Sequence, residues 1–486
     1  MAGIGIKLNR IYSKRTIVSS LYGIGLSVIY TIAPMLVIMG SLLLMYFLLG
    51  FDSVKYYDRE LFSCTVLYIF IFSLLFSSAF NSVLSKYIAD RNFEKQFSDI
   101  PPCIFVGILL KLGISTIISV PFYLWEIIVG KVPVYYVFTS YMCYMSLTLV
   151  FALMLYGVVI KQFSRVSLFF IAGAITSVLT SCLFRYVFDM EITYSMLLAL
   201  AIGFWLTAIL ELFMVKRRFS ESSNRFRQVL RYFKQYWRLV LSDFLYIFGL
   251  FCHNFVFWTV PWRMEIANTY VCNQPYDMAT CLGMFTNLSA TVLFVSKVEM
   301  HFFKYYRQFN TAIVGGSYEQ IEKSRKRLFQ SLVKESMDMV YIQFAISIII
   351  YLLAVIFLPM IGFGGMTMEI YPLMAVGYFI SFIMYSNILF LQYFTDYKGT
   401  IITGLIFSCV GTIGAYISTN LPVAWYGSGF TVAALLAYAF SFLRMRKMEK
   451  NIYAHTFCVG SILPYKNGKM PDQQIYHKEQ NVDKKM

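Results

Sequence analysis

The chain has 486 residues, of which 59% are hydrophobic and only 14% are charged, and its mean hydropathy is +0.65. A soluble domain carries about 25% charged residues, so this composition excludes soluble enzyme folds, nucleic-acid-binding modules and disulfide-framed secreted domains. The sequence therefore predicts an all-α integral membrane protein.

Twelve apolar runs are long enough to cross a bilayer, which takes about 20 consecutive mostly apolar residues per helix. The first run contains Pro34 and is too long for a signal-peptide core, so we predict that it is an uncleaved, kinked helix. The predicted spans cover residues 22–49, 62–84, 103–128, 135–160, 167–188, 194–215, 239–261, 280–303, 339–361, 371–395, 399–419 and 424–443.

The net charge of +16 reflects the orientation of the chain. Of the 41 Lys and Arg residues, 34 fall in tails and connections on one side of the predicted spans and 5 on the other. Because basic residues accumulate on the cytoplasmic side of membrane proteins, we predict that both termini are cytoplasmic. The basic surface also favours contact with anionic membrane lipids, and it does not imply nucleic-acid binding.

The predicted spans divide equally around one long basic connection, an arrangement typical of transporters built from two repeats. We predict an N-terminal six-helix half over residues 1–215 and a basic amphipathic linker over 216–238. A C-terminal six-helix half then covers 239–446, and a polar cytoplasmic tail covers 447–486.

Two cytoplasmic segments have helical patterns of their own. In the linker, four large apolar side chains recur on one face, which is typical of a helix lying at a membrane surface. A cytoplasmic arm over 301–337 contains a break at Gly315–Gly316, after which Ser317 and Gln320 form a predicted capping box. Both segments could lie on the membrane, or they could dock a cytosolic partner. The apolar face of the linker consists of Phe226, Leu230, Phe233 and Trp237.

Signatures of catalysis and of metal binding are absent from the sequence. The chain has no Gly-x-x-x-x-Gly-Lys-Ser/Thr loop for a nucleotide phosphate and no Asp-x-Asp pair on the cytoplasmic side. None of the nine cysteines has a metal-ligand spacing. We therefore expect no enzymatic activity, no cofactor and no metal. Cys272 and Cys281 both fall on the outer side, so a disulfide between them stays open.

Ionisable residues within predicted spans are costly and therefore suggest function. His253, beside Asn254 near the middle of the seventh span, either bonds a neighbouring helix or lines a transport path. Lys111, about one-third of the way across the third span, either extends its ammonium to the membrane surface or lines the same path. Asp243, expected in the first turn of its helix, either complements that helix dipole or belongs to the path.

Three stretches of sequence resemble the PelG family, the integral membrane component of Pel exopolysaccharide export. The opening "MAGIGIKLNRIY" is similar to the start of that family, and "SKYIADRNFEKQ" at 85–96 resembles the segment after its second span. The most specific stretch covers 276–316 and continues into "EQIEKSRKRL"; it includes an acidic residue at Glu299 and the pair Tyr305–Tyr306.

This resemblance places the chain in the multidrug/oligosaccharidyl-lipid/polysaccharide exporter superfamily. It implies a plasma-membrane exporter of a hexosamine-rich polysaccharide that works with a cytosolic glycosyltransferase and a cyclic-di-GMP-responsive membrane subunit. Our hypothesis is that substrate passes between the two halves, along His253, Asn254, Lys111, Asp243 and Glu299. The synthase would dock on the arm through Arg325, Lys326, Arg327, Tyr305 and Tyr306.

Two other functions remain compatible with the sequence. One is an ion-coupled multidrug antiporter of the same fold, although such proteins usually place carboxylates deep in the bundle. The other is a membrane scaffold that holds the polysaccharide synthase and transports nothing itself.

Overall fold

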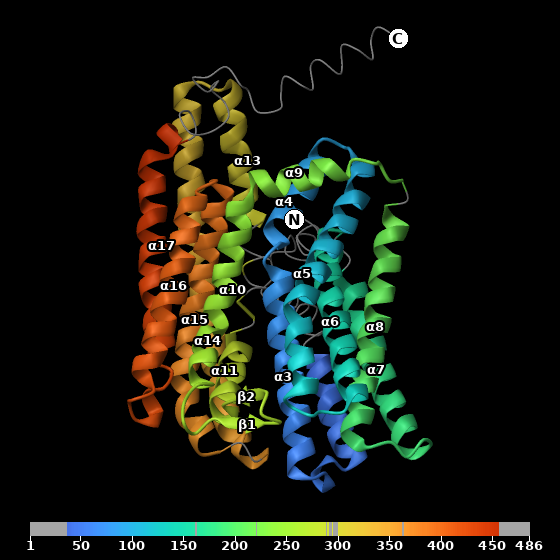
Figure 1. The fold of residues 1–486 in the computed structure, drawn as a ribbon. Helices are drawn as coiled ribbons and strands as arrows, with labels where there is room; N and C mark the ends of the chain where they lie inside the picture. The colour runs from blue at the N-terminus through green and yellow to red at the C-terminus, as the bar shows by residue number, and fades with distance from the viewer. Residues whose placement is uncertain are drawn as a thin grey trace.

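The computed structural model describes residues 36–160, 163–219, 221–287, 289–290, 294, 300–361 and 364–455. Within these ranges the chain is almost entirely helical, and its helices form two bundles that stand side by side (Figure 1). Ten of the described helices are long and apolar enough to cross a membrane, and a shorter apolar helix covers Leu36–Leu49. The chain is therefore an all-helical, multi-span membrane protein.

The ten long helices coincide with ten of the twelve predicted spans, which are thereby confirmed. The predicted spans 22–49 and 280–303 lie partly outside the described residues. For these two spans the sequence-based expectation stays a prediction.

The first bundle is built from the N-terminal part of the chain. A turn at Ala79–Phe80 separates the helix Tyr56–Ser78 from the helix Asn81–Phe93. The predicted span 62–84 is therefore divided between these two helices. Gly173 and Gly203 face each other across two later helices, and a Cβ on Gly203 would lie 2.6 Å from the carbonyl oxygen of Gly173. Small residues allow such close packing of membrane helices. The helices are α3 (Tyr56–Ser78), α4 (Asn81–Phe93), α5 (Ile100–Ile128), α6 (Val134–Ile160), α7 (Phe163–Tyr186) and α8 (Ile192–Arg218).

The second bundle follows a short helix, α9 (Phe226–Gln235), that runs across one end of the first bundle (Figure 1). Between its first two helices lies an antiparallel hairpin of β1 (Met264–Ile266) and β2 (Tyr270–Cys272). The helices of this bundle are α10 (Trp237–Phe257), α11 (Gln274–Asn287), α13 (Met300–Gly315), α14 (Tyr318–Phe357), α15 (Met366–Tyr393), α16 (Tyr397–Ser418) and α17 (Ser428–Ala454).

The linker contains the expected helix, although its predicted apolar face is shared between two elements. Phe226 and Leu230 are exposed on α9, while Val229 is buried against the first bundle. Trp237 is also exposed, but it is the first residue of α10. A helix with one packed face and one exposed apolar face is suited to the membrane interface.

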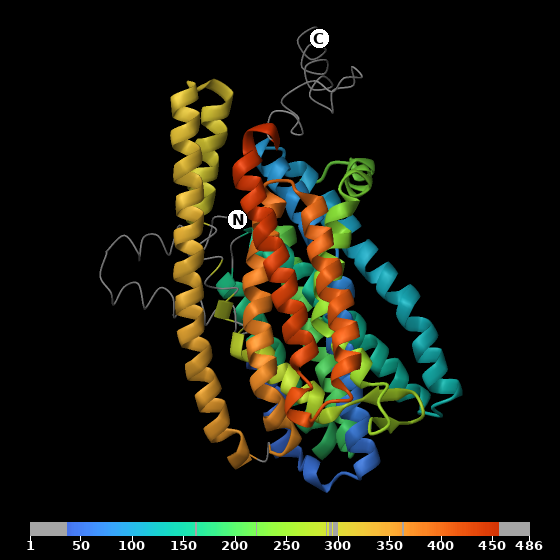
Figure 2. The same ribbon diagram turned by 90° about the vertical axis from the view of Figure 1, so that its left-hand side faces the viewer.

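The two ends of the molecule differ. We call the end that carries β1 and β2 the hairpin end, and the opposite end, where α13 and the first part of α14 project beyond the other helices, the arm end (Figure 2). The projecting pair corresponds to the predicted arm, 301–337. Its capping box is confirmed: Gln320 N donates to Ser317 Oγ over 3.4 Å, and Ser317 N donates to Gln320 Oε1 over 3.2 Å.

The second part of the predicted arm and the ninth predicted span belong to one helix. Helix α14 runs without interruption through 40 residues. The reason is that no Gly or Pro occurs between Tyr318 and Pro359 to end it. At about 1.5 Å per residue it is about 60 Å long, twice the thickness of a bilayer core. Its apolar half bonds the end of α11 and the residue pair after it: Ser347 Oγ donates to Asn287 Oδ1 over 2.7 Å, and Ser289 Oγ donates to Gln343 Oε1 over 2.9 Å.

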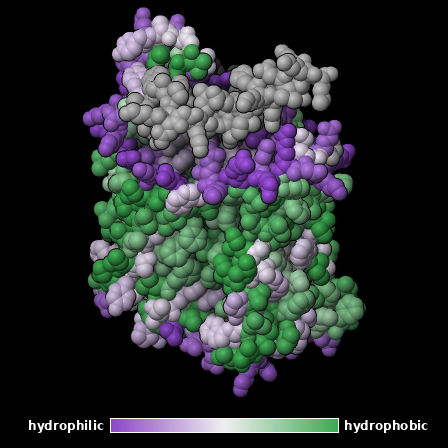
Figure 3. All heavy atoms as spheres, turned by 45° about the horizontal axis from the view of Figure 1, so that its top comes forward, coloured by the Kyte–Doolittle hydropathy of each residue, from purple (hydrophilic) through white to green (hydrophobic). Residues whose placement is uncertain are grey.

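The surface of the bundles matches a membrane environment. Hydrophobic residues cover the sides of the molecule, and hydrophilic residues gather in a band toward the arm end (Figure 3). Large apolar side chains such as Ile117, Leu179 and Ile413 are more than half exposed there. A surface of this kind is stable in contact with lipid and would aggregate in water.

Helices α16 and α17 cross at a pair of glycines, and this crossing makes a testable prediction. A Cβ on Gly429 would lie 2.2 Å from the carbonyl carbon of Gly414, so Gly429→Ala should force the helices apart and cost about 1–3 kcal/mol. The measurement is the midpoint of thermal unfolding in detergent, which should fall by several degrees.

The matched control is Gly113→Ala on α5, where an added Cβ meets nothing within 4 Å. Because alanine favours helix, this variant should unfold at the same or a slightly higher temperature. Equal losses in the two variants would contradict the close crossing.

Candidate functional site

A polar cluster joins the two bundles toward the arm end, and it contains two of the predicted path residues. Lys111 Nζ on α5 donates to Asn81 Oδ1 at the start of α4, over 2.7 Å. Asp243 on α10 accepts from Ser82 N over 3.0 Å and from Gln392 Nε2 over 3.2 Å. We call these five residues the interbundle cluster. It draws on α4 and α5 of the first bundle and on α10 and α15 of the second.

Asp243 acts on a different helix from the one expected. It is the seventh residue of α10, beyond the first turn, so it does not complement the dipole of its own helix. Its carboxylate instead accepts from Ser82, in the first turn of α4, whose N-cap residue Phe80 makes no side-chain cap. A carboxylate at a helix N-terminus satisfies a free backbone N–H and stabilises the helix. The second bundle therefore caps a helix of the first.

Lys111 does not extend to the membrane surface. Its side chain is fully buried, and its ammonium bonds Asn81 within the bundle. That alternative from the sequence is wrong, because a polar acceptor on the neighbouring helix lies closer than the aqueous phase. A buried ammonium next to the junction of two bundles is a candidate for substrate contact or for holding the bundles together.

His253 and Asn254 lie nearer the hairpin end, within the second bundle. His253 is four residues from the end of α10, so it is not at the middle of that helix. Its Nδ1 is 2.9 Å from Tyr276 Oη on α11, and its ring packs on Phe430 with the two ring centroids 4.4 Å apart. Of the two alternatives, the structure has the histidine bonded to a neighbouring helix.

Asn254 belongs to a carboxylate site that the sequence did not reveal. Asp277 Oδ1 accepts from Asn254 Nδ2 over 2.7 Å, and both its oxygens accept from Trp258 Nε1, at 3.0 and 3.1 Å. The backbone N–H of Asn273 completes the set at 2.9 Å. Four donor contacts leave this buried carboxylate well satisfied, so Asp277 orients Asn254 and fixes the start of α11.

The predicted path residues therefore form two separate groups. Lys111 and Asp243 meet in the interbundle cluster, whereas His253 and Asn254 lie about 15 Å further along α10, at 1.5 Å per residue. Glu299 lies outside the described residues.

The predicted docking residues on the arm have unequal access to a partner. Arg325 donates to both oxygens of Glu322, at 2.7 and 3.0 Å, and also to the carbonyl oxygen of Glu449 on α17. Tyr306 is largely buried and donates to the carbonyl oxygen of Tyr393 over 3.1 Å. Lys326 is 64% exposed and Arg327 is also exposed. The last two are the most accessible cations of the predicted set.

Glu322 lies in the projecting part of α14, well before its apolar half. Hydrogen bonds from Arg325 and then from Tyr453 lower the pKa of its carboxyl to about 2. Because this pKa is below the ordinary carboxyl pKa, near 4.5, the contact stabilises the fold fully at every pH above that ordinary pKa. The stabilisation is lost as the pH falls toward 2. The tie between α14 and α17 is therefore intact at neutral pH.

A groove of about 710 Å³ runs along this part of α14 and reaches Glu449 on α17. Its walls combine basic and apolar side chains. Tyr305 does not line the groove, and the ammonium of Lys304 lies over its ring. The α14 residues lining it are Arg325, Lys326, Phe329, Gln330, Val333, Lys334, Met337, Asp338 and Tyr341.

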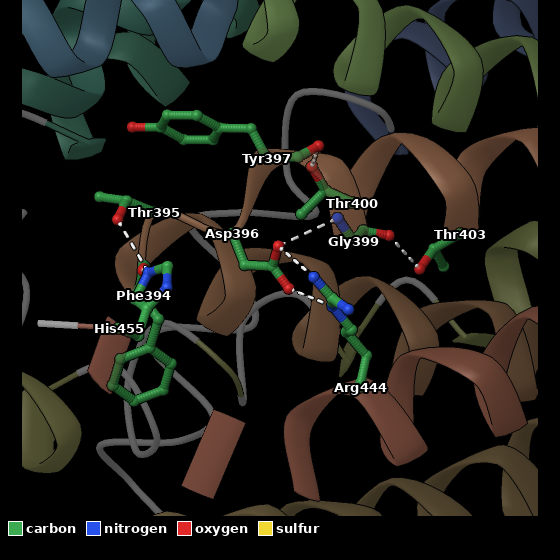
Figure 4. Close-up of polar contacts among 9 residues, drawn as sticks. All are labelled: Phe394, Thr395, Asp396, Tyr397, Gly399, Thr400, Thr403, Arg444 and His455. Atoms are coloured by element: carbon green, nitrogen blue, oxygen red, sulfur yellow. Dashed lines mark hydrogen bonds and ion pairs between the residues drawn. The ribbon is translucent and has the colours of Figure 1, made fainter. Parts of the chain in front are cut away.

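A second polar cluster at the arm end joins α15, α16 and α17, and no sequence argument identified it (Figure 4). Asp396 accepts from Gly399 N over 3.2 Å, which caps α16. Arg444 on α17 donates to both Asp396 oxygens, from Nε at 2.5 Å and from Nη2 at 3.0 Å. Beside it, His455 Nε2 lies 2.7 Å from the carbonyl oxygen of Phe394. Every contact here is internal, so we assign the cluster to structure.

Several solved structures with a similar fold are MATE transporters. The chain is similar to the eukaryotic MATE transporter AtDTX14, with a TM-score of 0.60, 11% identity, and coverage of 90% of this chain and 99% of that one. It is similar to an outward-facing MATE family transporter of the MOP superfamily, with a TM-score of 0.54, 13% identity and coverages of 88% and 96%. It is also similar to the Vibrio cholerae MATE transporter VcmN, with a TM-score of 0.54, 12% identity, and coverage of 88% of this chain and 97% of that one. The protein thus has a MATE-like transporter fold.

The family model of PelG, described as "Putative exopolysaccharide Exporter (EPS-E)", matches residues 1–457. The chain belongs to the PelG family of exopolysaccharide exporters, as its sequence motifs predicted. No curated protein sequence matches the chain significantly.

The interbundle cluster makes a prediction about stability. Asp243→Ala leaves the Ser82 N–H and the Gln392 amide without their acceptor, and leaving a buried donor unsatisfied costs about 1–3 kcal/mol. Asp243→Asn keeps an acceptor and should lose clearly less. Thermal unfolding in detergent should rank the proteins as wild type, Asp243→Asn, then Asp243→Ala.

The control is Asp338→Ala on the exposed surface of α14, which should leave the unfolding temperature within about one degree. An Asp243→Ala protein as stable as this control would contradict the cap on α4.

Proposed function

We propose that this protein exports a hexosamine-rich exopolysaccharide across the plasma membrane, working with a cytosolic glycosyltransferase. The observation that carries the proposal is the match to the PelG family over residues 1–457, together with a fold shared with MATE transporters. The family supplies the exported class of molecule and the fold supplies two bundles that can enclose a path. The sugar and the synthase come from the sequence resemblance.

In this proposal the chain has twelve spans, in halves 1–215 and 239–446, and both termini are cytoplasmic. The arm end then faces the cytoplasm. Support comes from the basic residues, because the exposed group Lys216, Arg217 and Arg218 ends α8 at that end, next to α9. The hairpin end faces outward, and the tail 447–486 and the linker 216–238 lie on the cytoplasmic side.

The substrate path runs between the bundles, past the interbundle cluster. Lys111 and Asp243 are placed to act on it directly, since they lie where α4 and α5 meet α10 and α15. His253 and Asn254 act less directly, by fixing the packing of α10 on α11. Glu299 is proposed for the path on the strength of the family motif alone.

The synthase docks on the arm, and a cyclic-di-GMP-responsive membrane subunit completes the complex. The groove along α14 supports this role because it combines the exposed cation Lys326 with exposed apolar side chains at Val333 and Met337. Arg325 and Tyr306 shape the arm through internal contacts. Tyr305, Lys326 and Arg327 remain for the partner.

Deleting the gene in frame tests the export function. Hexosamine-rich polymer in the medium should disappear and return when the wild-type gene is supplied. A copy with Lys111→Ala should restore assembly with the partners but at least about tenfold less external polymer, because the path loses its buried cation. The measurement is polymer in the medium and inside the cell.

Two outcomes would support other functions. External polymer that survives the deletion, with a loss of resistance to toxic cations, favours the multidrug antiporter. Full export by Lys111→Ala and by Asp243→Ala, both assembled, favours a scaffold that does not transport.

Charge reversal on the arm tests the docking surface. In the double variant Lys326→Glu, Arg327→Glu, two exposed cations become anions. The Arg325–Glu322 contact at 2.7 Å is kept, and the longer Lys326–Glu322 pair at 3.7 Å is lost. Recovery of the glycosyltransferase in a pull-down should fall about tenfold, which corresponds to about 1.4 kcal/mol.

The matched control reverses Arg217 and Arg218, two exposed cations at the end of α8. It makes the same change in net charge and should leave recovery unchanged. Equal losses from both double variants would show a general charge effect and argue against a site on the arm.

A further inference from the structure

Two cysteines from distant parts of the chain meet at the hairpin end. Cys64 lies in α3 of the first bundle, and Cys272 is the last residue of β2. Their Sγ atoms are 3.0 Å apart, although 208 positions separate them in the sequence. A disulfide bond is about 2.05 Å long, so an approach of about 1 Å would bring the sulfur atoms to bonding distance.

The hairpin is held against α3 by contacts that fix the position of Cys272. Tyr68 Oη on α3 donates to the carbonyl oxygen of Val271 over 2.9 Å and accepts from Val271 N over 3.1 Å. Alternate residues of a strand point to the same side, and Tyr270 and Cys272 are both buried, at 1% and 3% exposure. The side of β2 that carries Cys272 therefore packs on the first bundle.

The base of the same hairpin is held by the second bundle. Asn273, directly after Cys272, donates from its backbone N to Asp277 Oδ2 over 2.9 Å and from Nδ2 to the carbonyl oxygen of Phe257 over 3.5 Å. A covalent bond at Cys272 would thus connect α3 of one bundle with the start of α11 in the other.

We propose that Cys64 and Cys272 form a disulfide that joins the two bundles at the hairpin end. The two thiols lose two protons and two electrons as the sulfur–sulfur bond forms, and the disulfide of an extracytoplasmic thiol–disulfide oxidant is reduced to two thiols in exchange. This rests on the orientation given under the proposed function, because disulfides persist outside the cytoplasm.

The burial of the pair sets the order of events. Cys64 is 1% exposed, so an oxidant must reach the two thiols during folding, before the hairpin packs on α3. After folding, the same burial shields the disulfide from reductants. With the bond in place, the hairpin and the adjoining end of α3 stay together during any movement of the bundles.

The structure favours Cys64 over Cys281 as the partner of Cys272. Cys281 lies on α11, two turns beyond its start, and among the described residues it makes no sulfur–sulfur contact with Cys272. The disulfide between Cys272 and Cys281 that the sequence left open is the competing arrangement, and it is the natural control.

Thiol counting on the full-length protein tests the bond. Membranes are denatured in the presence of N-ethylmaleimide to block every free thiol, then reduced, and the thiols released from disulfides are labelled with a maleimide-linked polyethylene glycol. Of the nine cysteines, two should be labelled in wild-type protein, seen as a two-step shift on a gel. Label should be absent from Cys64→Ser and from Cys272→Ser, and two labels should remain in Cys281→Ser.

Mass spectrometry of unreduced chymotryptic peptides should then link the segment containing Cys64 to the segment containing Cys272. Wild-type protein without label after reduction would overturn the proposal. So would label that is lost in Cys281→Ser and kept in Cys64→Ser, because it would assign the bond to Cys272 and Cys281. Neither readout uses export, so a failure here leaves the exporter assignment standing, and a failure of export leaves the bond standing.

Discussion

A charged or polar group inside a membrane protein has no water to bond, so the packing of the helices must supply its partners. The carboxylates of Asp243 and Asp277 illustrate the two solutions found in this chain. Asp277 collects its donors from within one bundle, from Asn254, Trp258 and the backbone of Asn273. Asp243 takes one donor from each bundle, Ser82 and Gln392. The position of the bundles relative to each other therefore depends on a carboxylate that neither bundle satisfies alone.

The bundles are joined at both ends by contacts of different kinds. At the arm end the polar junction is the hydrogen bond from Ser82 on α4 to Asp243 on α10. At the hairpin end it is a packed surface in which Tyr68 stacks on Trp258, with ring centroids 4.9 Å apart, and bonds the backbone of β2. Separating the arm ends breaks the hydrogen bond from Ser82 to Asp243, whereas separating the hairpin ends exposes several aromatic rings. The two ends therefore differ in the free energy needed to open them.

Features that depend on neighbouring residues could be predicted from the sequence. Apolar length gave ten confirmed spans, and local spacing gave the capping box at Ser317. The absence of Gly and Pro after Tyr318 is also visible in the sequence, and it agrees with one helix that continues from the arm into the ninth predicted span. The family motifs were sufficient for the family, because they extend over much of the chain.

The contacts of the candidate site could not be predicted, because they join residues far apart in sequence. Asp243 meets Ser82 across 161 positions, and Cys64 meets Cys272 across 208. The contacts of Asp277 could not be predicted because it precedes the apolar run by a few residues, and a carboxylate in that position usually faces water. Its signal was the clustering of Asn254, Trp258 and Asn273, which becomes apparent only once α10 and α11 are packed together.

The uninterrupted length of α14 gives the arm a mechanical property. Buried side chains such as Phe329 and Met339 pack this helix against α15 and α17 near its midpoint, so the contact acts as a fulcrum. From Phe329 to Tyr318 the helix extends about 17 Å, and from Met339 to Phe357 about 27 Å, at 1.5 Å per residue. A load on the tip that tilts the helix about this contact must first break the bonds of Arg325 and Glu322 to α17, and it then moves the far limb the opposite way. That limb is bonded to Asn287 through Ser347, so α11 either follows the swing or gives up the bond.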